Sequence, residues 1–454
     1  MSRLLVLFFV AIGPLAWGDH RPNVLVIVAD DLGYADLGFQ GAKDIQTPNL
    51  DSLAATSVRC TSGYVSHPFC SPTRAGLLTG RYQHRFGHEN NPPHAPEDAK
   101  AGLPVDQITI AQVMKEAGYK TGLVGKWHLG AHPSFHPNRR GFDEFFGFIG
   151  GGHLYDPLDA KGGAEYKVPL EFNGEDRPFD RYLTDILGRE ASAFVDRHAA
   201  KPEPWMLFLT FNAPHTPLSA PKELIEKYKN IADENRRMYA AMIDSMDSAI
   251  GGVVETLAKT GERENTLVFF MSDNGGAHLA FRGMSNFANN KPLRGAKGDV
   301  LEGGIRVPFL VSWPRLLKPG VYDRPVIALD VFATVAAAGG GTVPSDRVMD
   351  SVNLMPYLRG YSAGDPHSSL FWRSGGPGGK YAVRQGDWKL VRETGKEDAL
   401  YALDQDVGET KSLAASEPAK LSELKSLLAD WEKETIPPVF AGPKPGQSKK
   451  KAKK

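Results

Sequence analysis

Cys70 begins the segment of this sequence that is best suited to chemistry, Cys70-Ser-Pro-Thr-Arg-Ala-Gly-Leu-Leu-Thr-Gly80. Pro72 is of the type that begins helices, and residues 75–78 can continue a helix. Cys70 would then lie at a helix N-terminus, where free N–H groups and the helix dipole favour anions and lower the pKa of a thiol. The segment predicts a reactive cysteine beside an anion site, or more simply a structural cysteine.

Acidic side chains follow two apolar runs. Asp30 and Asp31 follow the first run, and Asp273 and Asn274 follow the second. Neighbouring carboxylates at a buried strand end repel each other unless a cation neutralises them. Three carboxylates and an amide oxygen are hard ligands, which suit Ca²⁺, or Mg²⁺, better than Zn²⁺. Each aspartate alone could be a helix cap or a turn residue, but the two motifs together predict a metal site.

Cations and histidines complete the set of reactive side chains. Arg74, Lys126 and Lys297 are of the types that hold anionic oxygens. His128 and His215 titrate near neutral pH and could transfer protons. Each also has a simpler interpretation, as a surface cation or a packed histidine.

Buried strands must position these side chains. The apolar runs at 23–28, 121–124, 205–211 and 266–271 do not alternate with polar residues, which indicates strands buried on both faces of a parallel sheet. Helices are expected at 110–117, 182–198 and 237–260. Strands that alternate with helices predict an α/β fold, a large doubly wound and mostly parallel sheet flanked by helices.

Each of the four runs is followed by polar residues suited to chemistry. They are Asp30-Asp31, Lys126-Trp-His128, Asn212-Ala-Pro-His215 and Asp273-Asn274. Because functional groups gather beyond the carboxyl ends of parallel strands, one site is expected to contain them all.

The sequence changes character after about residue 340. The segment 381–391 reads as a hairpin with a Gly-Asp turn, and 418–435 reads as an amphipathic helix that begins at a proline. We expect a catalytic domain over 19–345, a smaller C-terminal antiparallel α+β domain over 346–440, and a disordered Lys-rich tail over 441–454.

The N-terminus has the pattern of a signal peptide. Arg3 precedes an apolar run from Leu4 to Trp17, and Ala16-Trp-Gly18 resembles a cleavage site. An uncleaved anchor is the alternative, but the run is short for a bilayer. We expect residues 1–18 to be removed, the protein to be secreted or periplasmic, and the mature chain to have no membrane span. Lys and Arg together number 53, as do Asp and Glu, so bulk charge gives no indication of nucleic-acid binding.

The chain has only two cysteines, Cys60 and Cys70. In a secreted protein they could form a local disulfide. The motif that begins at Cys70 disfavours this interpretation and would leave Cys60 as an unpaired, buried thiol.

The pattern Cys70-x-Pro-x-Arg74, extended by Ala75 to Arg81, resembles the signature of the type I sulfatases, an arylsulfatase-like family within the alkaline phosphatase superfamily. The resemblance runs from about residue 21 to at least 315. It is also carried by Pro22-Asn-Val-Leu25, Asp30-Asp31, Gly125-Lys-Trp-His-Leu-Gly130, Ala213-Pro-His-Thr-Pro217, Asp273-Asn-Gly-Gly276, and Lys297 followed by Glu302-Gly-Gly-Ile-Arg-Val-Pro308.

This resemblance implies hydrolysis of sulfate esters. It implies that a formylglycine-generating enzyme oxidises Cys70 to Cα-formylglycine, whose hydrate has two hydroxyls. One would attack sulfur, and loss of a proton from the other would expel sulfate. The roles implied are acid for His215, base for His128, sulfate-binding cations for Lys126, Lys297 and Arg74, and Ca²⁺ ligands for Asp30, Asp31, Asp273, Asn274 and the modified Cys70.

The expected substrate is a sulfated carbohydrate, attacked at a chain end, with aryl sulfates as the alternative. Candidate sugar contacts lie in segments expected to form rim loops: His88 to His94, His153, Tyr155, Asp156, Arg282, Trp372 and Arg373. Two other functions stay open at this point. A phosphonate or phosphate ester hydrolase of the same superfamily could use the same formylglycine. A non-catalytic glycan-binding protein is disfavoured because Cys70, His215 and the acidic residues are all present.

Overall fold

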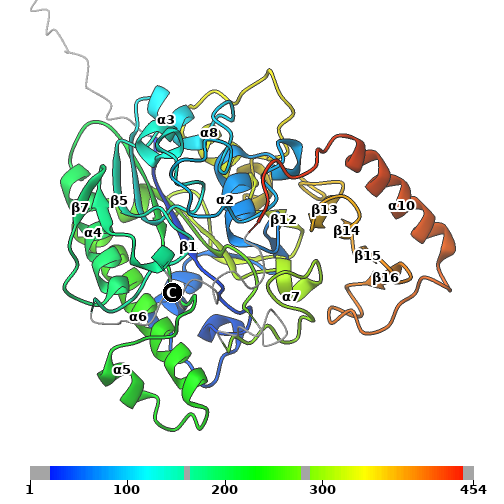
Figure 1. Cartoon of the computed structure of the whole chain (residues 1–454), viewed down its shortest axis with the longest axis horizontal. Helices are drawn as coiled ribbons and strands as arrows, with labels where there is room; N and C mark the ends of the chain where they lie inside the picture. The colour runs from blue at the N-terminus through cyan, green and yellow to red at the C-terminus, as the bar shows by residue number, and fades with distance from the viewer. Residues whose placement is uncertain (1–20, 158–163, 278–286, 443–454) are drawn as a thin grey trace, which may run out of the picture.

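A ten-stranded sheet flanked by helices forms most of the molecule, and a smaller four-stranded sheet lies beside it (Figure 1). The computed structural model describes residues 21–157, 164–277 and 287–442. The large sheet has the order β11-β2-β10-β9-β1-β8-β4-β5-β6-β7. The predicted α/β fold is confirmed.

The four predicted strands are neighbours at the centre of this sheet. They are β9 (Thr266–Ser272), β1 (Asn23–Ala29), β8 (Trp205–Thr210) and β4 (Lys120–Lys126), and all pair in parallel. Within β1, Val24, Val26 and Val28 pack into one hydrophobic cluster, whereas Leu25 and Ile27 pack into the other. The continuous apolar run therefore reflects a strand that is covered on both faces.

The outer strands of the sheet include both parallel and antiparallel pairs. Parallel pairing continues from β4 to β5 (Glu144–Phe148), but β10 (Phe309–Ser312) is antiparallel to both of its neighbours. The remaining strands are β2 (Val58–Cys60), β6 (Leu170–Phe172), β7 (Glu175–Arg177) and β11 (Gly320–Tyr322). A separate two-stranded sheet joins β3 (Gly63–Tyr64) and β12 (Val326–Ile327).

Helices cover both faces of the large sheet. One face carries α1 (Pro48–Ala55), α4 (Leu183–His198), α5 (Lys222–Lys227) and α6 (Glu234–Lys259). The other carries α2 (Cys70–Thr79), α3 (Ile110–Glu116) and α8 (Asp330–Gly339). Two single-turn helices, α7 (Glu302–Ile305) and α9 (Met355–Leu358), also lie in this part of the chain. The three predicted helices correspond to α3, α4 and α6.

The C-terminal part is an antiparallel sheet with one helix, as predicted. Its strands are β13 (Leu370–Ser374), β14 (Lys380–Gln385), β15 (Trp388–Glu393) and β16 (Ala399–Ala402). Helix α10 (Pro418–Lys433) buries Leu424, Leu428 and Trp431. The chain then returns to the large domain (Figure 1). There, Ile436 N donates to His84 O at 2.9 Å.

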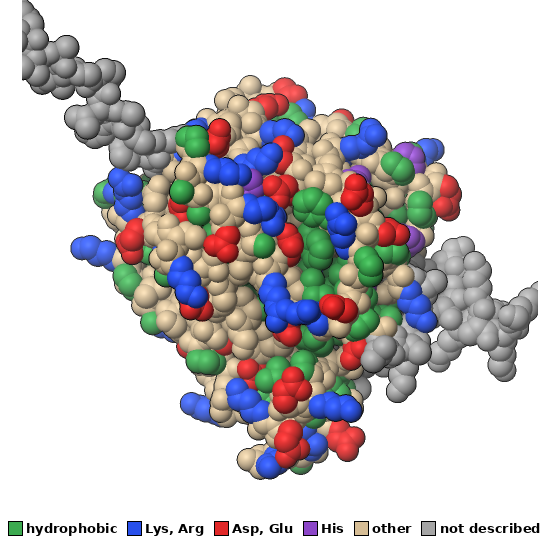
Figure 2. Space-filling model, turned by 90° about the vertical axis from the view of Figure 1, so that its left-hand side faces the viewer, with side chains coloured by type: hydrophobic (Ala, Val, Ile, Leu, Met, Phe, Trp, Pro, Cys, Tyr) green, Lys and Arg blue, Asp and Glu red, His purple; other side chains and the backbone are tan. Residues whose placement is uncertain are grey.

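Two predicted segments lie outside the described residues, namely the signal peptide and all of the Lys-rich tail beyond Gly442. Within the described part of the chain, no helix combines the length and apolar character needed to cross a membrane. Figure 2 shows basic and acidic side chains interspersed over one face, in keeping with the zero formal net charge.

Candidate active site

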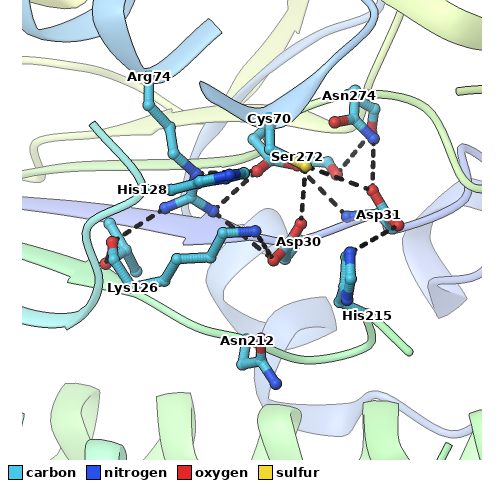
Figure 3. A network of polar contacts seen from close by, with 12 residues as sticks. Asp30, Asp31, Cys70, Arg74, Lys126, His128, Asn212, His215, Ser272 and Asn274 are labelled. Carbon is cyan, nitrogen blue, oxygen red and sulfur yellow. Dashed lines mark hydrogen bonds and ion pairs between the residues drawn. The ribbon is translucent and has the colours of Figure 1, made fainter. Parts of the chain in front are cut away.

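The carboxyl ends of the four central strands meet at one place, as the sequence predicts (Figure 3). Asp30 N donates to Ala213 O at 3.0 Å, which ties the end of β1 to the turn after β8. Asp273 N donates to Ala29 O at 3.0 Å, which ties the end of β9 to β1. The side chains of Asp30, Asp31, Lys126, Asp273 and Asn274 gather in one buried space. The Asn212 amide turns away from it (Figure 3), and its Nδ2 donates to His153 O at 3.0 Å.

Cys70 is the first residue of α2 and faces this space. Its Sγ lies 3.4 Å from Asp30 Oδ1 and 3.9 Å from Asp31 Oδ1 (Figure 3). Lys297 Nζ lies 3.3 Å from the same sulfur. Burial and the negative charge of Asp273 raise the pKa of the Cys70 thiol well above its usual value. An unmodified Cys70 would thus be a protonated and poor nucleophile.

Cys60 lies in β2, and both cysteines are free and buried. The disulfide interpretation is therefore wrong, and the expectation of a buried Cys60 thiol is confirmed. Burial raises the pKa of Cys60, so this thiol is chemically quiet.

Three buried carboxylates are each paired with one buried cation. Lys126 Nζ lies 2.5 Å from Asp30 Oδ2, and Lys297 Nζ lies 2.7 Å from Asp31 Oδ1. The third pair is Arg74 Nη2 with Asp273 Oδ2, at 2.8 Å. The six charges balance, and their removal from water is tolerated because each has a partner.

The two carboxylates at the centre of this set differ in proton affinity. Burial raises the pKa of Asp31, but the charge of Lys297, with a smaller contribution from His215 once it is protonated at low pH, outweighs burial and brings that pKa to about 2. Burial and repulsion from Asp30 raise the pKa of Asp273 to about 6, against the pull of Arg74. The raised pKa of Asp273 thus reflects burial and the crowding of carboxylates at this strand end, which a bound metal ion would relieve.

The residues present fit a hard divalent cation. Ligand atoms of Asp30, Asp31, Cys70 and His215 all lie within 4.8 Å of one another. Two ligands of one Ca²⁺ are at most about 5 Å apart, since each lies about 2.3–2.6 Å from the ion. Asn274 Oδ1 is buried and has no hydrogen-bond partner among the described residues, so it offers a free oxygen.

Asp31 has a strained backbone at this point. Its φ is 63°, in the left-handed region that residues other than glycine seldom adopt. Such strain persists only where the surrounding structure imposes it, and it gathers at functional sites. Here it turns the Asp31 carboxylate toward Lys297 and Asn274 Nδ2, which lies 2.7 Å from Asp31 Oδ1.

His215 is held in one tautomer. Its Nδ1 lies 2.6 Å from Thr216 O, so Nδ1 must donate, and its Nε2 lies 3.7 Å from Asp31 Oδ2. Burial lowers the pKa of His215 to about 3, with Lys297 and Lys126 adding to the effect and Asp31 opposing it. The imidazole is therefore neutral while the site is free of substrate.

His128 approaches from the end of β4. Its φ is 60°, and its carbonyl accepts a hydrogen bond from Ser71 Oγ at 2.6 Å, which joins this turn to α2. Its Nε2 lies only 2.6 Å from where a Cβ on Gly151 would stand, so only glycine leaves room for the ring. Burial and the charge of Lys126 lower the pKa of His128 well below the usual value. A neutral imidazole of this kind can accept a proton.

Comparison with known proteins agrees with this geometry. The sulfatase family model matches residues 22–341. The chain belongs to the sulfatase family. Its fold class and its activity as a sulfuric ester hydrolase, both expected from the sequence, are thereby confirmed.

Individual sulfatases are similar over most of the chain. N-acetylgalactosamine-6-sulfatase of Mus musculus is 33% identical over 376 residues, which cover 79% of this chain and 70% of that protein. Steryl-sulfatase of Rattus norvegicus is 35% identical over 426 residues, with coverage of 77% and 72%. The crystal structure of Ps i-CgsB in complex with k-i-k-neocarrahexaose has a TM-score of 0.87 and 39% identity, with coverage of 92% and 94%.

Several residues predicted to contact a sugar have their polar groups engaged by other parts of the protein in this sulfatase, so that prediction is wrong for them. Trp372 is fully buried, and its Nε1 donates to Val65 O at 2.7 Å. Arg373 is paired with Glu89 at 2.7 Å inside the protein. They join the C-terminal sheet to the large domain and do not close a pocket, which removes the basis for predicting attack at a chain end.

Two further predicted contacts are structural. Tyr155 is buried, and its hydroxyl lies 2.7 Å from Asn212 O and 2.8 Å from His215 O, so it supports the turn that carries the candidate acid. His153 is also buried, with Nδ1 2.7 Å from Leu154 O.

The loop from His88 to His94 is partly buried and partly open. His88 lies inside, with Nε2 2.7 Å from Ser71 Oγ, whereas His94 is exposed. Asp156 is exposed as well, and Arg282 lies outside the described residues. His94 and Asp156 thus stay candidates for contact with a sugar.

Sequence reasoning missed how this loop supports the nucleophile helix. Asn91 Oδ1 accepts from Ser71 N at 3.1 Å and so satisfies a free N–H beside Cys70. Asparagine commonly caps helices, but Asn91 lies 20 residues along the chain from the helix residue that it caps. No pattern local to α2 signals such a partner.

Proposed function

We propose that this sulfatase removes sulfate from sulfated oligosaccharides, with a formylglycine made from Cys70 as nucleophile and Ca²⁺ as the bound metal. One observation carries this proposal: Cys70 begins α2 between the carboxylates of Asp30 and Asp31 and the ammonium of Lys297. This arrangement supports a nucleophile at residue 70, at the point where a cation site and an anion site would meet.

The modification would supply what the thiol lacks. A hydrated aldehyde provides one hydroxyl to attack sulfur and a second whose deprotonation releases sulfate. Ca²⁺, held by Asp30, Asp31, Asp273, Asn274 and residue 70, would lower the pKa of the attacking hydroxyl and polarise the sulfate oxygens. Mg²⁺ is the alternative ion.

The cations would bind the sulfate group. Three carboxylates and three cations balance, so a divalent ion gives the site a net positive charge that attracts an anionic ester. Lys126, Lys297 and Arg74 would then be able to donate some of their hydrogen bonds to the sulfate oxygens. Developing negative charge would be stabilised there without reorganisation of solvent.

The two histidines would move protons. His215 is neutral in the free site, so protonation of the departing alkoxide requires that the charge of the bound ester raise its pKa. His128 is already neutral and would take the proton from the second hydroxyl. His215 would therefore become a proton donor only when substrate is bound, whereas His128 would already be a proton acceptor.

Two of the three similar proteins described above favour a carbohydrate substrate, and the steryl-sulfatase does not. One relative is named for N-acetylgalactosamine 6-sulfate chemistry, and Ps i-CgsB was crystallised with k-i-k-neocarrahexaose. The similarity to Ps i-CgsB covers 92% of this chain and 94% of that chain, so it includes the C-terminal sheet. We infer a sulfated oligosaccharide of the neocarra type, and export through the N-terminal signal to where such polymers occur.

Sulfate release from a defined panel tests this proposal. The panel holds sulfated neocarra-oligosaccharides, N-acetylgalactosamine 6-sulfate, nitrophenyl sulfate, and nitrophenyl phosphate and phosphonate, with Cys70→Ala as the inactive control. We expect kcat/KM on an oligosaccharide to exceed that on nitrophenyl sulfate by orders of magnitude, because remote binding energy assists the reaction. Preference for aryl sulfates would refute the carbohydrate assignment, and preference for phosphorus esters would favour the superfamily alternative.

A further inference from the structure

A buried cluster of charges lies where the C-terminal sheet meets the segment that carries Lys297. Lys389 Nζ, from β15, lies 2.8 Å from Glu302 Oε1 and 2.9 Å from Glu409 Oε1. Glu302 N donates to Glu409 Oε2 at 2.8 Å. All three residues are fully removed from solvent.

This cluster is costly for the protein to keep. Charges taken out of water often stabilise a fold less than well-packed apolar residues of the same volume would. Glu409 also has a φ of 51°, in the left-handed region. Burial raises the pKa of Glu302, but Lys389 and Arg306 outweigh it and bring that pKa to about 2, so Glu302 is ionised. Retained charge and backbone strain together point to a role in fixing geometry.

Glu302 belongs to a segment that is tied to the active site on one side. Lys297 N donates to Gly276 O at 3.2 Å, two residues after Asn274, which is proposed to bind the metal. Gly298 N donates to Pro68 O at 2.9 Å, just before Cys70. A short segment of backbone therefore connects Glu302 to Lys297 and Gly298, whose hydrogen bonds lie next to the active site.

The C-terminal sheet holds the same segment on the other side. Lys380 Nζ donates to Asp299 Oδ1 at 2.7 Å, and Arg294 Nη2 donates to the hydroxyl of Tyr401 at 3.0 Å. With the Glu302 cluster, these contacts fix the segment from 294 to 302 at three points. Lys297 lies between the first and the last of them.

We propose that Lys389 and Glu409 are positioning residues for Lys297, so that the C-terminal sheet sets the placement of its ammonium beside Asp31 and Cys70. This inference rests on the proposed role of Lys297 as a sulfate-binding cation. A shift of about 1 Å at a reacting centre can cost roughly 100-fold in rate. The buried cluster keeps such a shift from occurring.

Two variants test the proposal in the full-length, matured enzyme. Lys389→Met removes the central charge, and Glu409→Gln changes the cluster with almost no change in shape, which keeps the test usable if the first variant folds poorly. Lys425→Met is the matched control, because Lys425 is also a lysine of the C-terminal part but pairs with Asp398 at 2.9 Å at the surface. We expect kcat/KM to fall about 10–100-fold in the two cluster variants and to stay unchanged in the control.

A double-mutant cycle with Lys297→Met separates positioning from general weakening. If Lys389 acts through Lys297, adding Lys389→Met to Lys297→Met lowers kcat/KM no further. Equal losses in the presence and absence of Lys297 would overturn the proposal, and so would full activity of folded Glu409→Gln and Lys389→Met proteins. A fully active Lys297→Met protein would instead refute the proposed role of Lys297 itself.

Discussion

Lys126 Nζ lies 2.5 Å from Asp30 Oδ2, and both side chains are completely buried. The pair joins the end of β4 to the end of β1, so the carboxylate proposed to bind the metal and a cation proposed to bind sulfate already share one contact. A metal ion at Asp30 would take over part of this contact and let the lysine face the ester.

The metal prediction concerns both activity and stability. Exhaustive chelation should abolish sulfate release, and Ca²⁺ should restore it better than Mg²⁺. Because an ion that binds only the folded state stabilises it, Ca²⁺ at about 100 times its Kd should add about 2.7 kcal/mol to the free energy of unfolding. Thermal melting with and without Ca²⁺ checks this, and Asp30→Asn should abolish the shift. Unchanged activity and melting after chelation would rule out the ion.

The nucleophile prediction is a covalent one. Mass spectrometry of the peptide that contains Cys70 should show an aldehyde in place of the thiol when a formylglycine-generating enzyme is co-expressed. Activity should rise in proportion to the converted fraction. The peptide with Cys60 provides the internal control, because it should carry an ordinary thiol in every preparation. High activity in material that holds only unconverted Cys70 would contradict the prediction.

Loss of His215 should depend on the leaving group. A sugar alkoxide leaves poorly without a proton, whereas nitrophenolate leaves easily. We therefore expect His215→Ala to lose about 10²–10⁴-fold on sugar sulfates and far less on nitrophenyl sulfate. Steady-state kinetics on both substrates measures the difference. An equal loss would mean that His215 only positions the sulfate.

A histidine far from the active site should make stability depend on pH. His367 Nε2 lies 2.8 Å from Asp330 Oδ1, at the start of α8. Burial lowers the pKa of His367, but Asp330 outweighs it and raises the pKa above its usual value. A raised pKa in the folded state stabilises the fold fully below the pKa of an unfolded histidine, about 6.5. That stabilisation is lost as the pH rises through the folded value.

Comparison with His367→Gln tests this linkage. The wild-type protein should exceed the variant in free energy of unfolding by about 1.5–3 kcal/mol at low pH, as for hydrogen bonds to charged groups, and by less at alkaline pH. Urea unfolding across the pH range measures the difference. A difference that does not change with pH would show that His367 stays neutral.

Local sequence patterns determined the centre of the fold and the composition of the candidate site. Four apolar runs predicted β1, β4, β8 and β9, because a strand buried on both faces needs apolar side chains at every position. Cys70 and Pro72 predicted the start of α2, and the Gly-Asp turn predicted the hairpin of β14 and β15. The polar residues just after these strands could then be assigned to one site, because parallel strands end at the same level.

Only the tertiary structure decided which polar and aromatic residues face solvent. Trp372, Arg373 and Tyr155 have side chains that suit either a sugar or a core, and packing of the C-terminal sheet on the large domain buries the first two. The contacts Asn91–Ser71 and Lys389–Glu302 join residues 20 and 87 positions apart. No local sequence pattern predicts such contacts, because they depend on how helices and strands pack together in the folded protein. The sequence therefore determined the reactive groups, and the packing decided what holds them in place.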